Sequence, residues 1–203
     1  MSMIPEKPPF KLLDILYKKE FILFVVLVSI LIMNSNISPY FLDLYNLIDS
    51  TFLFSEKAII ALTMTFVIIA RQIDLSVASI IAVSSCVLGY TTSLGYDTWL
   101  VISLTLLSGA ICGAFNGAII TKFAIPSIIV TIGTMSLFRG LAYSFLEDSY
   151  YNKFPKLVSN LGGGYLFGYI PYAFLTFIIL AFIFAFILHK TSVGKKIYSI
   201  GNN

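Results

Sequence analysis

The chain has 203 residues, of which 58% are hydrophobic and only 11% are charged, whereas charged residues make up roughly 25% of an average soluble domain. So few polar side chains cannot cover a water-facing globule, which excludes a soluble enzyme, a disordered chain and a nucleic-acid binder with a basic patch. The formal net charge is only +3. We therefore interpret the chain as an all-α, polytopic membrane helix bundle.

Six apolar segments predict six transmembrane helices, since a helix needs about 20 mostly apolar residues to cross the hydrocarbon core. In chain order they cover residues 21–40, 55–72, 75–95, 98–120, 125–145 and 169–188. The second segment has a short apolar run between Lys57 and Arg71. We expect it to be extended, either by residues 51–55 or by a helix that continues past Arg71.

The distribution of basic residues predicts the orientation, because Lys and Arg near span ends favour the cytoplasmic side. With the N-terminus inside, the external loops would hold only Lys57, Lys153 and Lys156. The cytoplasmic segments would hold Lys7, Lys11, Lys18, Lys19, Arg71, Lys122, Lys190, Lys195 and Lys196. Both termini are thus predicted to be cytoplasmic. The first segment also fits a signal peptide, but residues 34–40 contain no small-x-small cleavage site, which favours a retained anchor.

The fourth segment carries Gly109, Gly113 and Gly117 at four-residue spacing. Small residues at this period form a groove in which a second helix can approach closely. This pattern is typical of static packing and also of a helix that slides during a transport cycle. Asn116 lies on or beside the groove, and its amide needs a hydrogen-bond partner there.

Polar residues at membrane depth are the candidate substrate-pathway residues, because such groups are costly unless they face a partner or a cavity. Asp74 either caps a helix that starts at Leu75 or lies, with Ser76, beside the pathway at a break within the bilayer. Arg139 either extends to the outer headgroups or touches an acidic group or a polar solute. The complete candidate set is Asp74, Ser76, Asn116, Thr131, Thr134 and Arg139.

No residue pattern points to catalysis or to a metal. Cys86 and Cys112 lie inside apolar runs, so we expect small core side chains and no disulfide or metal site. The one histidine, His189, ends the sixth segment without an H-E-x-x-H motif, so an intramembrane enzyme is disfavoured. We expect no cofactor and no metal.

Four motifs carry a family resemblance: residues 73–79 (IDLSVAS), 113–117 (GAFNG), 125–140 (IPSIIVTIGTMSLFRG) and 191–203 (TSVGKKIYSIGNN). In this order they resemble the permease subunits of bacterial ABC importers for ribose, related simple sugars and autoinducer-2. The resemblance implies one membrane-embedded permease domain over residues 1–203 in the inner membrane. It also implies a second permease subunit, a periplasmic solute-binding protein and a cytoplasmic ATPase subunit. The chain has no G-x-x-x-x-G-K-[ST] motif, which favours ATP hydrolysis on a partner.

In the family, the segment after the sixth span belongs to the surface that meets the ATPase. The matching positions here are Gly194, Tyr198, Gly201 and Asn202. Family members continue beyond the motif at residues 191–203, so we expect the N-terminal part of a longer permease, which alone would not transport. The alternative is an ion-coupled secondary transporter of a small polar solute, for which only Asp74 offers an intramembrane carboxylate.

Overall fold

The structure is a computed structural model that describes residues 19–146 and 150–202. The chain divides into two compact units, Met1–Ser50 and Thr51–Asn203. The first unit contains α2 (Lys19–Ile37) and the start of α3 (Leu44–Ile69). Consecutive large apolar side chains of α2 are exposed, including residues 22–27. A helix that is hydrophobic on every side is typical of a membrane span.

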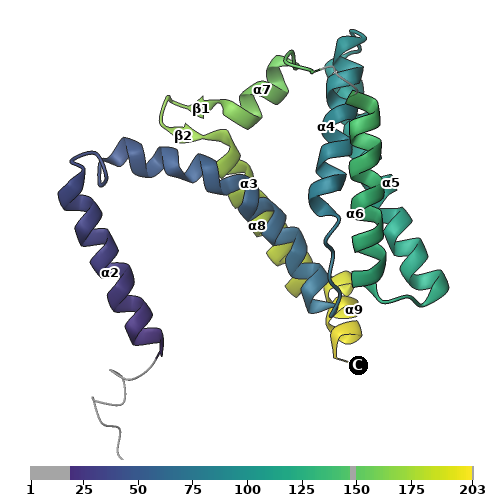
Figure 1. Cartoon of the computed structure of the whole chain (residues 1–203), viewed down its shortest axis with the longest axis horizontal. Coiled ribbons are helices and arrows are strands. Elements are labelled where there is room, and N and C mark those ends of the chain that lie inside the picture. Colours follow the sequence, from purple (N-terminus) through teal and green to yellow (C-terminus); the bar gives the residue numbers. More distant parts are fainter. Residues whose placement is uncertain (1–18, 147–149, 203) are drawn as a thin grey trace, which may run out of the picture. The chain divides into compact units, whose positions relative to one another are not determined.

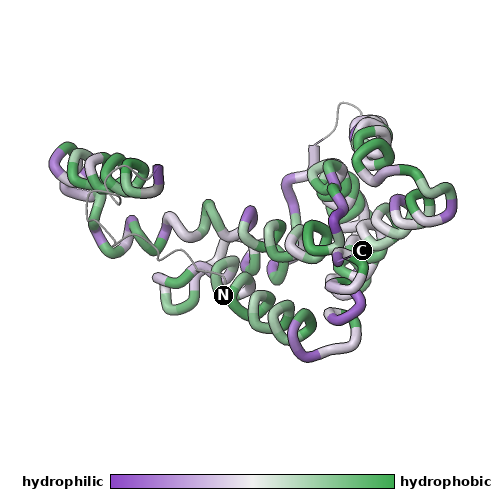
Figure 2. The backbone as a smooth tube through the Cα atoms, turned by 90° about the horizontal axis from the view of Figure 1, so that it is seen from below, coloured by the Kyte–Doolittle hydropathy of each residue, from purple (hydrophilic) through white to green (hydrophobic). Residues whose placement is uncertain are grey.

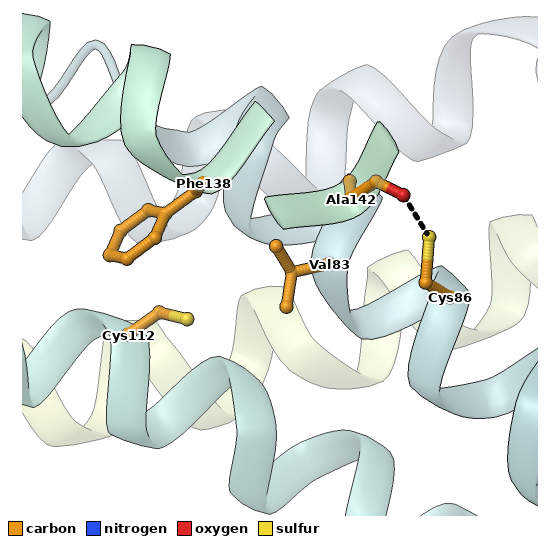
Figure 3. Packing of buried hydrophobic residues seen from close by; sticks show 5 residues of the cluster. All are labelled: Val83, Cys86, Cys112, Phe138 and Ala142. Carbon is orange, nitrogen blue, oxygen red and sulfur yellow. Dashed lines mark hydrogen bonds between the residues drawn. The ribbon is translucent and has the colours of Figure 1, made fainter. Parts of the chain in front are cut away.

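In the second unit, three helices pack together: α4 (Val77–Ser93), α5 (Thr98–Phe123) and α6 (Ser127–Leu146) (Figure 1). Their shared core consists of Val83, Cys86, Cys112, Phe138 and Ala142 (Figure 3). The Cys86 thiol donates to the Ala142 carbonyl at 3.6 Å. Both cysteines are free and buried, so their predicted place in the core is confirmed.

The remaining elements of this unit gather around α8 (Tyr172–Lys190). Phe54 and Phe66 of α3 contact Phe177 and Phe184 of α8, with ring centroids 5.9 and 5.2 Å apart. Before α8 come the short helix α7 (Lys156–Gly163) and a hairpin of β1 (Tyr165–Leu166) and β2 (Ile170–Pro171). The last helix is α9 (Ser192–Gly201).

Two helices end at a residue in the left-handed conformation, which closes a helix C-terminus. Arg71 (φ 54°) follows α3, and Ala124 (φ 51°) follows α5. The break at Arg71 separates α3 from α4 and leaves residues 72–76 without helical structure. This break brings backbone groups and polar side chains together at one end of the three-helix group.

All six predicted apolar segments contain a helix, which confirms the all-α architecture. Among the described residues, α3, α5, α6 and α8 are long and apolar enough to cross a membrane, while residues 21–37 and 77–93 form shorter apolar helices. Most of the residues along these helices are hydrophobic, which Figure 2 shows in green. The second segment is extended towards its N-terminus, because α3 begins at Leu44 and ends before Arg71. The number of spans and their orientation stay predictions.

Candidate functional site

The break before α4 is organised by Asp74. One carboxylate oxygen, Oδ1, accepts from the backbone N–H of Ser76 at 2.8 Å and from its hydroxyl at 2.6 Å. An aspartate readily reaches the N–H two residues ahead in this way. The predicted hydrogen bond from Asp74 to a backbone amide near the start of the helix is therefore present, but the expected helix start at Leu75 is wrong: α4 begins at Val77 with Ser76 as its N-cap residue. The carboxylate stabilises the loop in front of the helix.

Asn116 connects α5 to this loop. Its Nδ2 donates to the Ser76 hydroxyl at 2.8 Å, and both side chains are buried, with 4% and 0% of their surface exposed. The Ser76 hydroxyl has one proton, which it gives to Asp74, so it must accept from Asn116. This direction leaves Asn116 Oδ1 buried with no hydrogen-bond partner among the described residues.

The first turns of α6 hold the same loop through its backbone. The N–H of Ile73 donates to Ser127 Oγ at 3.0 Å, and Thr131 Oγ1 donates to the Ile73 carbonyl at 3.3 Å. Both backbone groups of this non-helical residue are thus paired, although its side chain is exposed. Three helices therefore meet at one set of hydrogen bonds, which we call the Asp74 network: Asp74, Ser76, Asn116, Ser127 and Thr131.

Four of these five residues are among the predicted substrate-pathway candidates, a role that stays a prediction, and Ser127 is not among them. Its position directly after Pro126, at the start of a helix, was the signal that could have identified it. Ser79 was also missed. It lies one turn after Ser76 on α4, is fully buried, and its hydroxyl has no partner among the described residues. Thr134, the remaining candidate of this region, is buried one turn after Thr131, and its hydroxyl donates to the Thr131 carbonyl at 3.5 Å.

Replacing Asp74 tests whether the network stabilises the fold. Asp74→Ala removes the acceptor of two hydrogen bonds at Ser76 and should lower the free energy of unfolding by about 1–3 kcal/mol. Asp74→Asn keeps an acceptor oxygen at the same place and should lose less than half as much. Thermal unfolding of the purified full chain in detergent measures both. Equal losses for the two variants would contradict the assigned hydrogen bonds.

Arg139 lies apart from the Asp74 network. It follows Thr131 by eight positions on α6, which is about 12 Å along the helix axis. Its side chain is exposed and lines a cavity of about 410 Å³ between α4, α6 and residues 151–154. No acidic side chain is among the described residues that line this cavity. The structure therefore separates the six pathway candidates: four belong to the Asp74 network, Thr134 lies beside it, and Arg139 lines a separate cavity.

The three glycines of α5 that were predicted to pack against another helix have different surroundings. A Cβ atom at Gly109 would lie 3.2 Å from Ser84 Oγ of α4, so the two helices approach closely there. Gly113 and Gly117 are exposed, and apart from their chain neighbours and the backbone of their own helix no described residue lies within 4 Å of the place where a Cβ would be. Their predicted role in helix packing thus concerns a face of α5 that the described chain leaves open.

The residues predicted to meet an ATPase lie on or just after α9. Gly194 is buried, and a side chain there would collide with the Leu188 carbonyl; one at Gly201 would collide with the Ile69 carbonyl of α3. The two glycines allow α9 to lie against the end of α8 and the end of α3. Tyr198 and Asn202 are exposed. The set therefore combines two close backbone contacts with two accessible side chains.

The family and the relatives of the chain come from comparison with known proteins. Residues 46–203 match the family model described as "Branched-chain amino acid transport system / permease component". The chain is 32% identical over 190 residues to the ribose import permease protein RbsC of Haemophilus influenzae, an alignment that covers 92% of this chain and 58% of the relative.

Two further relatives are permeases of autoinducer 2 import systems. LsrC of Escherichia coli O9:H4 is 34% identical over 145 residues (71% of this chain, 42% of the relative), and LsrD of Klebsiella pneumoniae is 32% identical over 198 residues (91% and 57%). The chain thus spans about half the length of the curated relatives it matches. No solved structure matches it.

Proposed function

The chain belongs to the family of branched-chain amino acid transport system permease components, and from this premise we propose that it acts in an ATP-driven importer of a small sugar-like solute. The solute would be ribose, a related monosaccharide or autoinducer-2. The observation that carries this proposal is the similarity over most of the chain to permeases of ribose and autoinducer 2 import. The protein is a multi-pass protein of the bacterial inner membrane.

In this proposal, residues 1–203 form one membrane-embedded permease domain and α9 is part of the surface that meets a cytoplasmic ATPase subunit. Gly194 and Gly201 position the helix, while Tyr198 and Asn202 are accessible for contact. A second permease subunit completes the pathway, and a periplasmic solute-binding protein delivers the solute. ATP hydrolysis takes place on the partner, and the permease itself catalyses no reaction.

The Asp74 network would lie at the cytoplasmic end of the pathway in the predicted orientation. Its three helices are joined by a few hydrogen bonds whose donors and acceptors could also bind a solute hydroxyl. Asn116 Oδ1 and Ser79 Oγ support this role, because both are buried and unpartnered among the described residues. Opening of the network would present Asp74, Ser76, Asn116, Thr131 and Thr134 to the solute.

Copurification with an ATPase subunit tests the proposed function. The full chain is coexpressed with the ATPase subunit of a ribose or autoinducer-2 importer from the same organism, and the ATPase retained with the tagged permease is quantified. Tyr198→Ala should lower the amount retained more than about fivefold, since an interface tyrosine commonly contributes more than 1 kcal/mol. Tyr96→Ala, at an exposed tyrosine between α4 and α5, is the matched control. Retention of no ATPase by the unmodified chain would contradict the proposal.

A further inference from the structure

We propose that the cavity beside Arg139 is a binding site for a neutral, polyhydroxylated solute of monosaccharide size. This inference rests on the proposed function, because the cavity would be the first place on the chain where the transported solute binds. In the predicted orientation, the cavity lies in the external half of the helix group. A solute from outside would therefore reach it before the Asp74 network.

The size of the cavity fits such a solute. Its volume is about 410 Å³, within the roughly 300–1,000 Å³ that is usual for small-molecule sites. The walls come from α4, α6 and the segment 151–154 that follows α6 in the chain. Rigid helices thus supply two sides, and a non-helical segment supplies the third.

Five of the nine residues that line the cavity offer groups that a carbohydrate site uses, and the other four are Ala82, Cys86, Ala142 and Leu146. The Arg139 guanidinium offers five N–H donors, and the Ser85 hydroxyl both donates and accepts. Tyr143, Tyr151 and Phe154 add aromatic faces, on which the C–H face of a sugar ring can stack. Donors for hydroxyl groups therefore stand beside flat apolar surfaces.

The same lining disfavours a strongly charged anion. Arg139 is the only cation among the described residues of this cavity. A phosphate ester that leaves water needs more compensating charge than one exposed guanidinium supplies, because desolvation of a multiply charged group is costly. Neutral hydroxyl groups can be satisfied by the arginine, serine and tyrosine groups that are present.

Tyr151 is held in the cavity wall by a specific contact with α4. Gly89 is buried, and a Cβ atom there would lie 2.6 Å from Cβ of Tyr151. Only glycine at this position lets the tyrosine lie against the helix. Tyr151 also borders a second cavity of about 480 Å³, whose lining includes Thr92, Ser93, Asn152 and Lys153. The aromatic wall therefore stands between the proposed site and a polar cavity that continues towards the end of α4.

Protection of an engineered cysteine tests the site directly. In the full chain carrying Cys86→Ala and Cys112→Ala, Ser85→Cys places a thiol in the cavity lining. The matched control is Ser144→Cys, at an exposed α6 serine that is not part of this lining. The purified variants in nanodiscs are alkylated with a neutral maleimide at increasing concentrations of D-ribose, D-xylose, D-galactose or D-glucose.

We expect at least one sugar to slow alkylation of the Ser85→Cys protein at least about threefold in a saturable manner, with the Ser144→Cys protein unchanged. Arg139→Gln, which keeps hydrogen-bonding ability but removes the charge and shortens the side chain, should weaken this protection. Gly89→Ala should abolish it by displacing Tyr151. Failure of all four sugars to protect, or equal protection of both thiols, would overturn the inference. Protection by ribose 5-phosphate without protection by any neutral sugar would also overturn it, in favour of an anion site.

Retention of the ATPase subunit by the same cysteine-substituted protein separates the two proposals. If the ATPase is retained and no sugar protects, the cavity assignment fails while the permease function stands. If sugar protects and no ATPase is retained, the binding site stands while the proposed ATP-driven function fails.

Discussion

Replacement of Gly201 by alanine is expected to detach α9 from the end of α3. The new methyl group would collide with the Ile69 carbonyl, which belongs to helix backbone and cannot move aside as a flexible side chain could. On helix propensity alone, alanine should stabilise α9 by roughly 0.5–1 kcal/mol. The close contact therefore predicts an effect opposite in sign to the intrinsic preference, which makes the outcome diagnostic.

Tryptic cleavage in α9 measures this effect, because the exposed residues Lys195 and Lys196 lie in that helix. We expect Gly201→Ala to raise the rate of cleavage after these lysines about tenfold, which corresponds to a loss of about 1.4 kcal/mol in docking free energy. Ser199→Ala, at an exposed position of α9, should leave the rate unchanged. A slower cleavage of Gly201→Ala would mean that α9 does not contact α3.

Asn116→Asp is the second substitution for which we expect a large effect. Aspartate has nearly the same shape as asparagine but lacks the Nδ2 group that donates a hydrogen bond to the Ser76 hydroxyl. Two carboxylates would then share the single proton of one serine, in a place where residue 116 is 4% exposed. We expect the free energy of unfolding to fall by about 2 kcal/mol or more, because a buried charge would lack a partner.

A reciprocal exchange provides the control for this prediction. In the double variant Asp74→Asn/Asn116→Asp, an amide at residue 74 can donate to Ser76, which in turn can donate to a carboxylate at residue 116. Net charge is that of the unmodified protein, and at least half of the lost stability should return in thermal unfolding of the full chain. Additive losses from the two substitutions would show that the groups do not interact through Ser76.

The helices could be predicted because their cause is local. A run of apolar residues of membrane-spanning length is helical whatever surrounds it, since every backbone group must be paired within the segment. The helical character of α5, α6 and α8 followed from this rule, and the core positions of Cys86 and Cys112 followed from apolar neighbours in the sequence. The ends of helices were less certain. One of the two roles predicted for Asp74 placed the start of α4 at Leu75, two residues too early, because an aspartate that accepts from the amide two residues on can stabilise a loop as readily as a helix start.

The amino-acid sequence by itself determined the all-α membrane character, the apolar segments and the polar residue types that could serve a solute. Only the tertiary structure decided which of them meet: Asn116 bonds to Ser76 across 40 positions of sequence, whereas Arg139 shares a cavity with Tyr151 and lies apart from Thr131. The reason is physical. Apolarity along one segment fixes its local conformation, but the pairing of polar groups depends on the angle and register at which separate helices pack.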